Sequence, residues 1–369
     1  MHARLLKYIK SAYKMKTLFL YITPAPTHRK LAESMGAEFK YAYPWKGKKF
    51  LKPIKLLYFT LTMPKRYDIY LCEGSTYLFP ALAKKLGLIH GKVIMIAADP
   101  LFHYIKRGLI TGISKTIYKN LLNYVDIFLC ASKFVKEDLK SLILDANAIV
   151  MYPLIDKNKK IILKRYSKII PNLNSKRIIF IGRPDIYYKG IDLLIDSFLK
   201  IKEIYPEAEL TLVGNFNKDS ILEYESKAAI KMPPKKISYI IKKINGKGIT
   251  ILKDLSNIDF VKALKSSSLY LHLGRGDAFV LAVEEAMLSG LPAIVSDETG
   301  SKEFVEILDK RFVVKMEKDE IVKAVVDYFS CPYKKKLALS KKALLISQKF
   351  SSNSEKNFRK TLDNILSNK

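Results

Sequence analysis

Two loops in the second half of the chain carry charged side chains at spacings that could bind a diphosphate. The stretch from Phe180 to Gly190 reads FIGRPDIYYKG, in which Arg183 and Lys189 are six positions apart. Arginine offers a planar fork for phosphate oxygens, and lysine offers a compact positive charge. Together they could neutralise a diphosphate without a metal ion. Two solvated loop cations in a basic chain would give the same pattern.

The second loop brings an acid to the start of a helix. Residues 274–287 read GRGDAFVLAVEEAM, with a predicted helix start near Phe279. The free amides of a helix start bind phosphate through the positive end of the helix dipole. Asp277 and Glu285 are eight positions apart, roughly 12 Å along a fully helical chain. That reach suits one acid on a sugar and one on a ribose, although Glu285 alone would read as a partly exposed helix acid.

Short apolar runs alternate with helical patterns around both loops, which predicts parallel α/β sheets. The strands are predicted at 17–23, 67–72, 93–97, 127–131, 148–152, 177–182, 209–213, 250–252, 270–273 and 293–296. The helices are predicted at 76–86, 133–142, 190–204, 258–267, 281–289, 301–308 and 335–366. We interpret the polar stretch 153–176 as a linker and the lysine-rich stretch 227–247 as a surface excursion. Both charged loops then follow strand ends, where ligands of such sheets bind.

Length and charge bound the classes of partner. The 369 residues suit two domains of roughly 150 residues each. Lys and Arg total 65 against 35 Asp and Glu, a formal charge of +30. Such a charge attracts polyanions: nucleic acid, anionic lipid or phosphorylated substrates. An AT-rich genome would also produce much of this lysine excess, so composition alone does not choose a partner.

Cysteine usage and hydropathy indicate a cytoplasmic protein. The three cysteines, Cys72, Cys130 and Cys331, are too few and too far apart for a disulfide framework or a zinc site. The first two fall in apolar runs and are predicted to be buried in strands. No stretch approaches 18 uncharged apolar residues, and the first residues lack the pattern of a signal peptide. We therefore expect a reducing, cytoplasmic location.

Two basic stretches suggest contact with a membrane surface. Residues 4–14 place Lys7, Lys10 and Lys14 at helical spacing opposite apolar residues, and 45–55 interleave lysines with Trp45 and Phe50. Basic amphipathic segments can lie on anionic membranes. An ordinary helical extension is the alternative for the first stretch.

Several motifs in the same order and spacing resemble a known family. The segment DAFVLAVEEAMLSGLPAIVSDETGSKEFV resembles the donor motif of the large retaining glycosyltransferase family often called group 1. The segment IGRPDIYYKGIDLLIDSF is similar to its Gly-Arg and Lys-Gly motif, and PEAELTLVGN is similar to its next strand and turn. YVDIFLCASKFVKEDL resembles a segment of its N-terminal half. The resemblance is strongest over 177–305, weaker over 67–152 and poor before residue 60.

The resemblance implies a GT-B architecture of two Rossmann-like domains facing a cleft. It implies an N-terminal acceptor domain over 1–160, with a C-terminal helix at 340–366 packing back on it, and a donor domain over 171–335. The implied substrate is a nucleotide-diphosphate sugar, used with retention of anomeric configuration and with no metal or other cofactor. Carried over by motif, Arg183 and Lys189 hold the diphosphate, Glu285 holds the ribose, and Asp277 lies near the donor sugar. The donor site would also include Gly182, Gly214, Phe279, Val280 and Leu281.

The chain departs from the family pattern at several positions. Asp277 stands where the family has glutamate, and Ala278 and Val280 replace two usual glycines. The glycine-rich loop after the first strand is absent, since the chain reads TPAPTH there. The usual His-Asp pair of the N-terminal half appears as Ala98-Asp99.

These departures leave three candidate site residues in the N-terminal half, with Asp99 as the catalytic candidate. Asp99 could orient a substrate or serve as a helix cap before Pro100. His28 and His103 are weaker candidates for acceptor contacts. His272 lies in a predicted strand, where a satisfied core histidine is the ordinary interpretation.

The leading hypothesis is a retaining glycosyltransferase acting on a glycan or lipid acceptor, with peripheral contact to an anionic membrane. An epimerase or a phosphorylase of the same fold fits less well. The rival of another class is a catalytically degenerate GT-B protein that binds nucleic acid or an anionic membrane through its basic surface. No nucleic-acid module is visible in the sequence, and its basic residues are scattered. Donor identity, acceptor and oligomeric state are not readable from the sequence.

Overall fold

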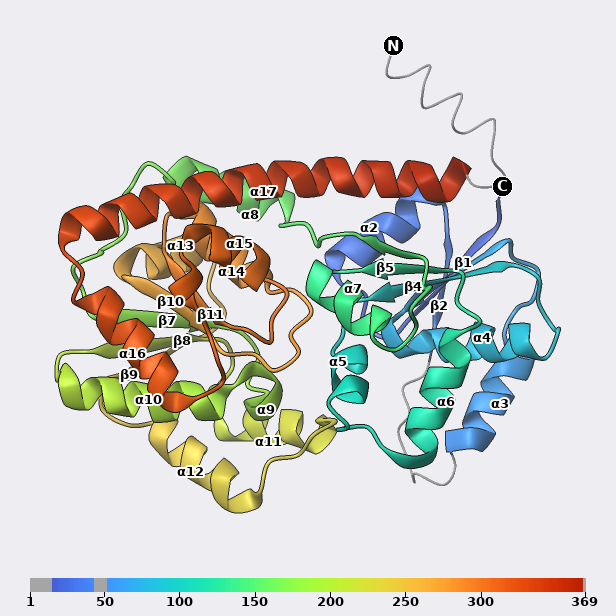
Figure 1. The fold of residues 1–369 in the computed structure, drawn as a ribbon, viewed down its shortest axis with the longest axis horizontal. Helices are drawn as coiled ribbons and strands as arrows, with labels where there is room; N and C mark the ends of the chain where they lie inside the picture. Colours follow the sequence, from blue (N-terminus) through green and yellow to red (C-terminus); the bar gives the residue numbers. More distant parts are fainter. Residues whose placement is uncertain (1–14, 43–51, 368–369) are drawn as a thin grey trace, which may run out of the picture. The chain divides into compact units, whose positions relative to one another are not determined.

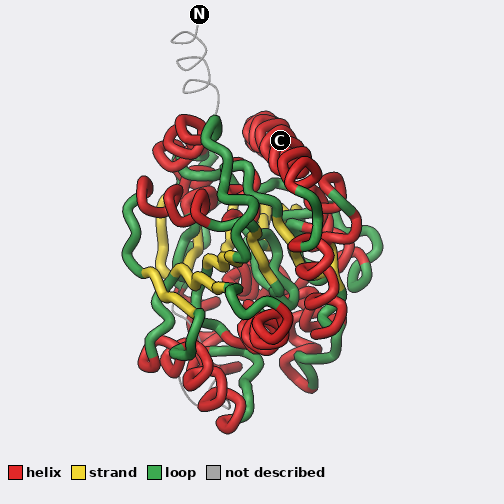
Figure 2. The backbone as a smooth tube through the Cα atoms, turned by 90° about the vertical axis from the view of Figure 1, so that its left-hand side faces the viewer, coloured by secondary structure: helices red, strands yellow, loops and turns green. Residues whose placement is uncertain are grey.

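The computed structural model describes residues 15–42 and 52–367. The basic stretch 4–14 and most of 45–55 lie outside these ranges. The chain forms two compact units: unit 1 comprises Met1–Pro153 with Ser354–Lys369, and unit 2 comprises Leu154–Asn353. Each unit is an α/β layer structure, with strands between helices (Figures 1 and 2).

Unit 1 contains one sheet of six parallel strands in the order β2-β1-β3-β4-β5-β6. Its strands are β1 (Thr17–Tyr21), β2 (Glu38–Tyr41), β3 (Ile69–Glu73), β4 (Lys92–Ala97), β5 (Ile127–Cys130) and β6 (Ala148–Val150). Its helices are α2 (Pro26–Ser34), α3 (Lys52–Thr62), η2 (Gly74–Tyr77), α4 (Leu78–Lys85), α5 (Leu101–Lys106), α6 (Gly112–Leu122) and α7 (Lys133–Lys140). The central strands are continuous apolar runs because helices cover both faces of the sheet. Cys72 and Cys130 are buried in β3 and β5 as predicted.

Unit 2 repeats this plan with strand order β12-β11-β10-β7-β8-β9, again all parallel. Its strands are β7 (Arg177–Ile181), β8 (Glu209–Val213), β9 (Ile249–Leu252), β10 (Leu269–His272), β11 (Ala293–Ser296) and β12 (Val313–Val314). Its first helices are α8 (Lys157–Tyr166), α9 (Ile186–Lys189), α10 (Ile191–Ile204), α11 (Lys218–Lys227) and α12 (Pro234–Ile244). The later ones are α13 (Asn257–Ser266), α14 (Leu281–Leu288), α15 (Lys302–Leu308), η3 (Lys310–Phe312), α16 (Lys318–Phe329) and α17 (Tyr333–Ser367).

Every predicted strand is present, with bounds that differ by at most two residues. Two polar stretches contain helices, and the interpretation of the first, 153–176, as a linker was wrong. The stretch 153–176 contains α8, because Asp156 caps its first turn and Leu163 is fully buried against unit 2. The stretch 227–247 contains α12, which buries Ile240 and Ile244.

Helix α17 is the longest helix of the described chain, and its residues divide between the units at Asn353 and Ser354. Its last turns join unit 1, where Phe358, Thr361 and Ile365 are buried. Among the described residues, none of the helices combines the length and apolar character needed to cross a bilayer.

Candidate functional site

The carboxyl ends of β7 and β10 define the first candidate site, in unit 2. These two strands are neighbours in the sheet. Strands β8 and β9 lie on the β7 side of the pair, and strands β11 and β12 lie on the β10 side. Connections from β7 and β10 therefore diverge to opposite sides, which makes this the topological switch point of the sheet. Ligands of open parallel sheets bind at this point. The structure places both sequence-predicted charged loops there.

The loop after β7 is built to deliver Lys189. Asp185 caps the one-turn helix α9 by accepting a hydrogen bond from the Tyr188 amide at 3.2 Å. Gly190 follows at φ 65°, and a Cβ there would lie 1.8 Å from the carbonyl oxygen of Leu273. Only glycine permits this close approach of the two loops.

Asp277 is the centre of a buried polar cluster. Its side chain is 4% exposed, and it accepts hydrogen bonds from three residues of two elements. Lys189 Nζ lies 2.5 Å from Oδ2, His272 Nε2 lies 3.0 Å from the same oxygen, and the Tyr188 hydroxyl donates to Oδ1 at 2.9 Å. The carboxylate is thus surrounded by donors and holds Lys189 in place.

Protonation in this cluster follows from burial and charge. Burial opposes ionisation of Asp277, but the Lys189 charge and the His272 hydrogen bond outweigh it and hold the pKa of the carboxyl well below its usual range. Burial lowers the pKa of His272, so its ring is neutral and donates through Nε2. His272 Nδ1 is buried and has no hydrogen-bond partner in the described part of the chain, and the ring stacks on Phe180 at 5.5 Å. His272 is a buried residue of β10 with a hydrogen-bond partner at Nε2, as expected of a core histidine, and that partner is Asp277 of the candidate site.

The backbone around Asp277 is fixed by the loop after β11. The carbonyl of Asp277 accepts hydrogen bonds from the Gly300 amide at 2.9 Å and the Thr299 hydroxyl at 3.1 Å. The positive φ of this turn falls on Gly276, at 75°. Ala278 and Val280 have no positive φ, so the lost family glycines leave no backbone strain at these positions.

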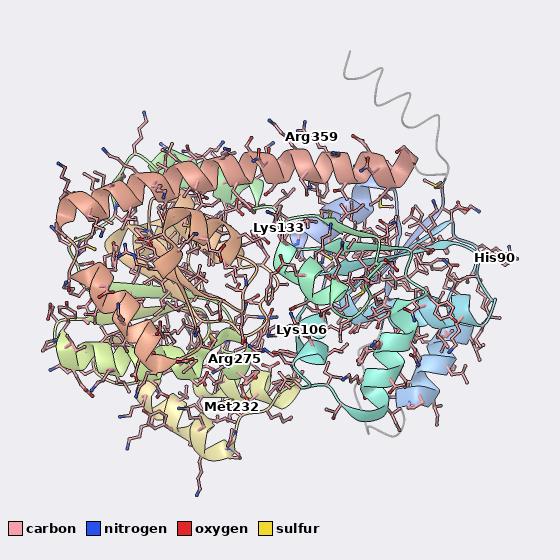
Figure 3. The ribbon with its side chains drawn as sticks, in the orientation of Figure 1. His90, Lys106, Lys133, Met232, Arg275 and Arg359 are labelled. Atoms are coloured by element: carbon pink, nitrogen blue, oxygen red, sulfur yellow. The ribbon has the colours of Figure 1, made fainter. Side chains whose placement is uncertain are left out.

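Arg275, in the same loop, has a structural partner that the sequence did not indicate. Its guanidinium binds Asp192 of α10 through two hydrogen bonds of 2.8 Å each and donates to the Tyr187 carbonyl at 2.8 Å. Figure 3 labels Arg275, and it lies beside α9. The bidentate pair clamps the loop after β10 onto the loop after β7.

Glu285 lies on α14, eight positions after Asp277. It is buried, so the alternative of a partly exposed helix acid was wrong. Its Oε2 accepts a hydrogen bond from Lys159 Nζ at 2.8 Å, and that ammonium lies 3.7 Å from the centre of the Phe260 ring. Burial raises the pKa of Glu285, although the Lys159 charge opposes this. Lys159 comes from α8, in the stretch interpreted as a linker, and no motif in that stretch indicated its role.

The remaining predicted donor residues frame this edge. Arg183 is exposed, and its guanidinium lies 5.7 Å from the Tyr224 ring centre. Among the described residues, no carboxylate forms an ion pair with it. A Cβ on Gly214 would lie 2.2 Å from the carbonyl oxygen of Gly182, so the ends of β7 and β8 need glycine there.

Helix α14 begins at Leu281, the first residue of the predicted range 281–289 and two residues after Phe279. Val280 is its N-cap residue, and an apolar side chain cannot cap the first amides. Phe279 packs against Phe304 and Phe350 with centroid distances of 5.9 and 5.7 Å, so its side chain belongs to the apolar cluster of unit 2.

Unit 1 has its own charged edge, at the carboxyl ends of β1, β3 and β4. Glu73, which sequence reasoning missed, binds His28 Nδ1 at 2.7 Å and accepts hydrogen bonds from the amides of Ile22, Thr23 and Ala25 at 3.2–3.3 Å. The carboxylate of Glu73 thereby shapes the loop that lacks the family glycines. Glu73 is the last residue of β3, a strand that borders the topological switch point of this sheet.

Asp99 joins this edge from the loop after β4. Its Oδ1 accepts a hydrogen bond from the Leu101 amide at 3.2 Å, and its Oδ2 packs so closely on Gly74 that a Cβ there would lie 2.4 Å away. Burial, with a smaller contribution from the Glu73 charge, raises the pKa of Asp99 to about 6. Asp99 therefore makes the predicted contact at the start of α5, and its pKa is also raised.

His103 has a separate partner. Its Nδ1 lies 3.0 Å from Asp138 Oδ2, and Lys106 binds the other oxygen at 2.6 Å. This buried pair joins α5 to α7 and does not include Glu73 or Asp99.

Comparison with known proteins agrees with the geometry in unit 2. Residues 165–344 match the family model of glycosyl transferases group 1. These residues resemble the group 1 glycosyltransferase domain. The matched range contains the complete sheet of unit 2 and every residue of the Asp277 cluster, so the protein is a glycosyltransferase with this cluster inside its family domain.

Solved structures show the fold of the whole glycosyltransferase. Anabaena Alr3699/HepE, in complex with UDP and glucose, matches with a TM-score of 0.63 and 16% identity over 95% of this chain and 100% of its own. The sucrose-phosphate synthase of Thermosynechococcus elongatus has a TM-score of 0.67 and 12% identity over 95% and 100%. A trehalose-6-phosphate synthase studied for glycosyl transfer with retention has a TM-score of 0.64 and 12% identity over 95% and 99%. The fold is GT-B, and a comparison with curated proteins gave no match.

Proposed function

We propose that this glycosyltransferase moves a sugar from a nucleotide-diphosphate sugar to an acceptor hydroxyl, with retention and without a metal ion. One observation carries the proposal: Arg183, Lys189 and the start of α14 lie together on the loops that leave the switch point of unit 2. Two cations and an uncapped helix start are the groups that a diphosphate needs. Support for retention comes from the family match and from the retaining trehalose-6-phosphate synthase of the same fold.

In this proposal each group acts on charge that develops during transfer. The bond from the anomeric carbon to the diphosphate oxygen breaks, and negative charge grows on the leaving diphosphate. Arg183, Lys189 and the amides of α14 stabilise that charge, an effect often worth several kcal/mol. The acceptor oxygen bonds to the same face of the sugar, and its proton passes to the departing diphosphate, so no separate base is required.

Glu285 and Asp277 take different roles in the donor site. Glu285 binds ribose hydroxyls with the carboxylate that Lys159 orients. Asp277 is a positioning residue, because its oxygens already accept three hydrogen bonds and its side chain is almost fully buried. It holds Lys189 toward the diphosphate instead of contacting the sugar itself. Gly182, Gly214 and Leu281 contribute backbone, and Phe279 and Val280 fix the start of α14.

The acceptor site that we propose is the edge of unit 1 formed by His28, Glu73 and Asp99. An imidazole bound through Nδ1 to a carboxylate presents Nε2 to a ligand. Two carboxylates and an imidazole suit hydroxyl groups better than a phosphate. The acceptor is therefore proposed to be a glycan or a lipid-linked sugar that offers hydroxyl groups to this edge.

Calorimetric titration with a panel of nucleotide-diphosphate sugars, beginning with UDP-glucose and without added metal, tests the donor site. We expect micromolar binding of one donor and at least a tenfold weaker affinity in Arg183→Ala, since a charge-assisted phosphate contact is worth about 1.5–3 kcal/mol. Arg177→Ala is the control, because Arg177 begins the same strand at the opposite edge of the sheet. If no donor binds the wild type, or if both variants lose affinity equally, the proposal is wrong. Salt-sensitive binding of polynucleotides alone would then favour the degenerate, non-catalytic alternative.

A further inference from the structure

Helix α3 of unit 1 has an apolar face that no part of the described chain covers. Its inner side is buried at Leu56 and Thr60, and the Phe59 ring lies 4.2 Å from that of Phe79 on α4. Four apolar or aromatic residues remain exposed on the helix, here called the α3 stripe: Ile54 at 64%, Leu57 at 46%, Tyr58 at 68% and Leu61 at 49%.

The α3 stripe is one continuous face. At about 100° per residue, its four positions fall within an arc of roughly 100° opposite the buried side. An ordinary solvated helix carries polar residues on that arc. Single exposed apolar residues are common on proteins, but a contiguous apolar face usually marks a contact surface.

The surroundings of the α3 stripe are basic. Residues 53–66 contain no Asp or Glu, and they include Lys55, Lys65 and Arg66. Helix α6, which packs on α4 as α3 does (Figure 1), adds exposed Lys115 and Lys119. A second copy of a chain with charge +30 would place like charges together at this surface. An anionic partner with an apolar interior complements both features.

We propose that the α3 stripe docks unit 1 on an anionic lipid bilayer. The helix lies in the plane of the membrane, with its four apolar side chains at the boundary between headgroups and acyl chains. Lysines beside it contact lipid phosphates, and Tyr58 occupies the interface that tyrosine favours. The docking surface is separate from the donor site and does not depend on the proposed chemistry. It would bring the acceptor edge of unit 1 to lipid-linked substrates.

Sedimentation of the full-length protein with vesicles tests this surface. We expect binding to vesicles of phosphatidylglycerol and phosphatidylcholine and weak binding to phosphatidylcholine alone. Leu57→Glu/Tyr58→Glu should reduce the partition coefficient by about tenfold or more, because it removes two of the four apolar anchors. The matched control is Tyr333→Glu/Leu345→Glu on α17, where the same residue types are 46% and 65% exposed. Both variants change the net charge equally.

The outcomes separate the α3 stripe from general electrostatics and from self-association. Loss of vesicle binding in the α3 variant alone supports the proposal. Equal loss in both variants, or no binding of the wild type to anionic vesicles, overturns it. A wild-type dimer in light scattering that the α3 variant converts to monomer would assign the α3 stripe to a second copy. Donor affinity should be the same in all three proteins, so a failure of docking leaves the proposed transfer untouched.

Discussion

Asp277 occupies a position where the family has glutamate, and its surroundings decide which acid fits. Its carboxylate meets Lys189, His272 and Tyr188 at hydrogen-bonding distances, and a Cβ on Gly274 would lie 2.9 Å from Asp277 Cβ. The shorter acid is therefore matched to a histidine at position 272 that closes the cluster from β10. Aspartate together with His272 therefore holds Lys189 in position without the longer side chain of glutamate.

The first prediction follows from that fit. Asp277→Glu should lower the free energy of unfolding by about 1–3 kcal/mol, because an extra methylene overpacks a buried site. It should not raise transferase activity. Asp277→Asn keeps the size but leaves Lys189 without its counter-ion, and we expect a loss of about 3–5 kcal/mol. Urea unfolding and donor turnover measure both effects. An Asp277→Glu enzyme that is more active than the wild type would show that the aspartate is a decayed family glutamate.

The second prediction concerns Lys159 as a positioning residue. In Lys159→Met, Glu285 loses the charge that opposes the rise of its pKa. Protonated Glu285 should then become populated at higher pH than in the wild type, and donor affinity should fall about tenfold with a steeper loss toward acid pH. Calorimetry across a pH series measures this shift. Lys164→Met, on the exposed side of α8, is the control, and equal behaviour of both variants would remove Lys159 from the donor site.

The third prediction uses the titration of Asp99. Its pKa in the folded protein, about 6, exceeds the ordinary value of 3.8. Between these values the folded chain binds more protons than the unfolded chain, so this group's contribution to stability falls as the pH rises through the window. Asp99→Asn should remove that contribution. Between the two pKa values, the free energy of unfolding should therefore change by up to about 2–3 kcal/mol less in the variant than in the wild type. Unfolding curves at several pH values from 4 to 7 test it, and parallel pH profiles for both proteins would contradict it.

At the scale of elements, apolar patterning predicted the sheets well and the surface elements poorly. The central strands are buried on both faces, so they read as uninterrupted apolar runs. The edge strand β2 was missed because its four residues are mostly exposed. Helix α8 buries only Leu163 fully, and its other positions are dominated by lysine. Its contribution to the site, Lys159, meets a partner 126 residues away, and no local pattern encodes such a pair.

The residues of the candidate sites also differ in how readily the sequence identifies them. Arg183, Lys189, Asp277 and Glu285 were readable because their loops carry family motifs at fixed spacing. Glu73 and His272 were not, because each acts through contacts made only after parallel strands align. Sequence therefore indicates residues in a local motif more readily than residues whose partners lie on other strands and helices.

The fourth prediction tests the junction between α9 and α10. Gly190 and Gly87 both have positive φ, 65° and 69°, but only Gly190 packs against backbone. Gly87→Ala should cost about 1–2 kcal/mol through φ alone. Gly190→Ala should cost clearly more, since its Cβ would meet the Leu273 carbonyl at 1.8 Å, and it should also weaken donor binding by displacing Lys189. Unfolding free energies of the two variants compare these costs directly, and equal values would mean that the loop relaxes freely.

At the scale of the whole molecule, α17 contributes buried residues to both compact units. Phe350 contacts Phe279 and Phe304 in unit 2, whereas Phe358 is buried in unit 1 with Lys30 5.3 Å from its ring centre. One helix therefore completes two cores with different residues. The stability of each unit can be changed separately through its own phenylalanine.

The fifth prediction exploits this division. Phe358→Ala should lower the unfolding free energy of unit 1 by about 3–5 kcal/mol, the usual cost of truncating a buried phenylalanine. Donor binding should survive, because the donor residues that we propose all lie in unit 2. Phe350→Ala is the matched variant on the same helix, and it should weaken donor binding because Phe279 loses a ring partner beside the start of α14. Hydrogen exchange resolves which unit opens in each variant, and calorimetry gives donor affinity. Loss of donor binding in Phe358→Ala, with unit 2 still protected from exchange, would show that unit 1 contributes to donor affinity.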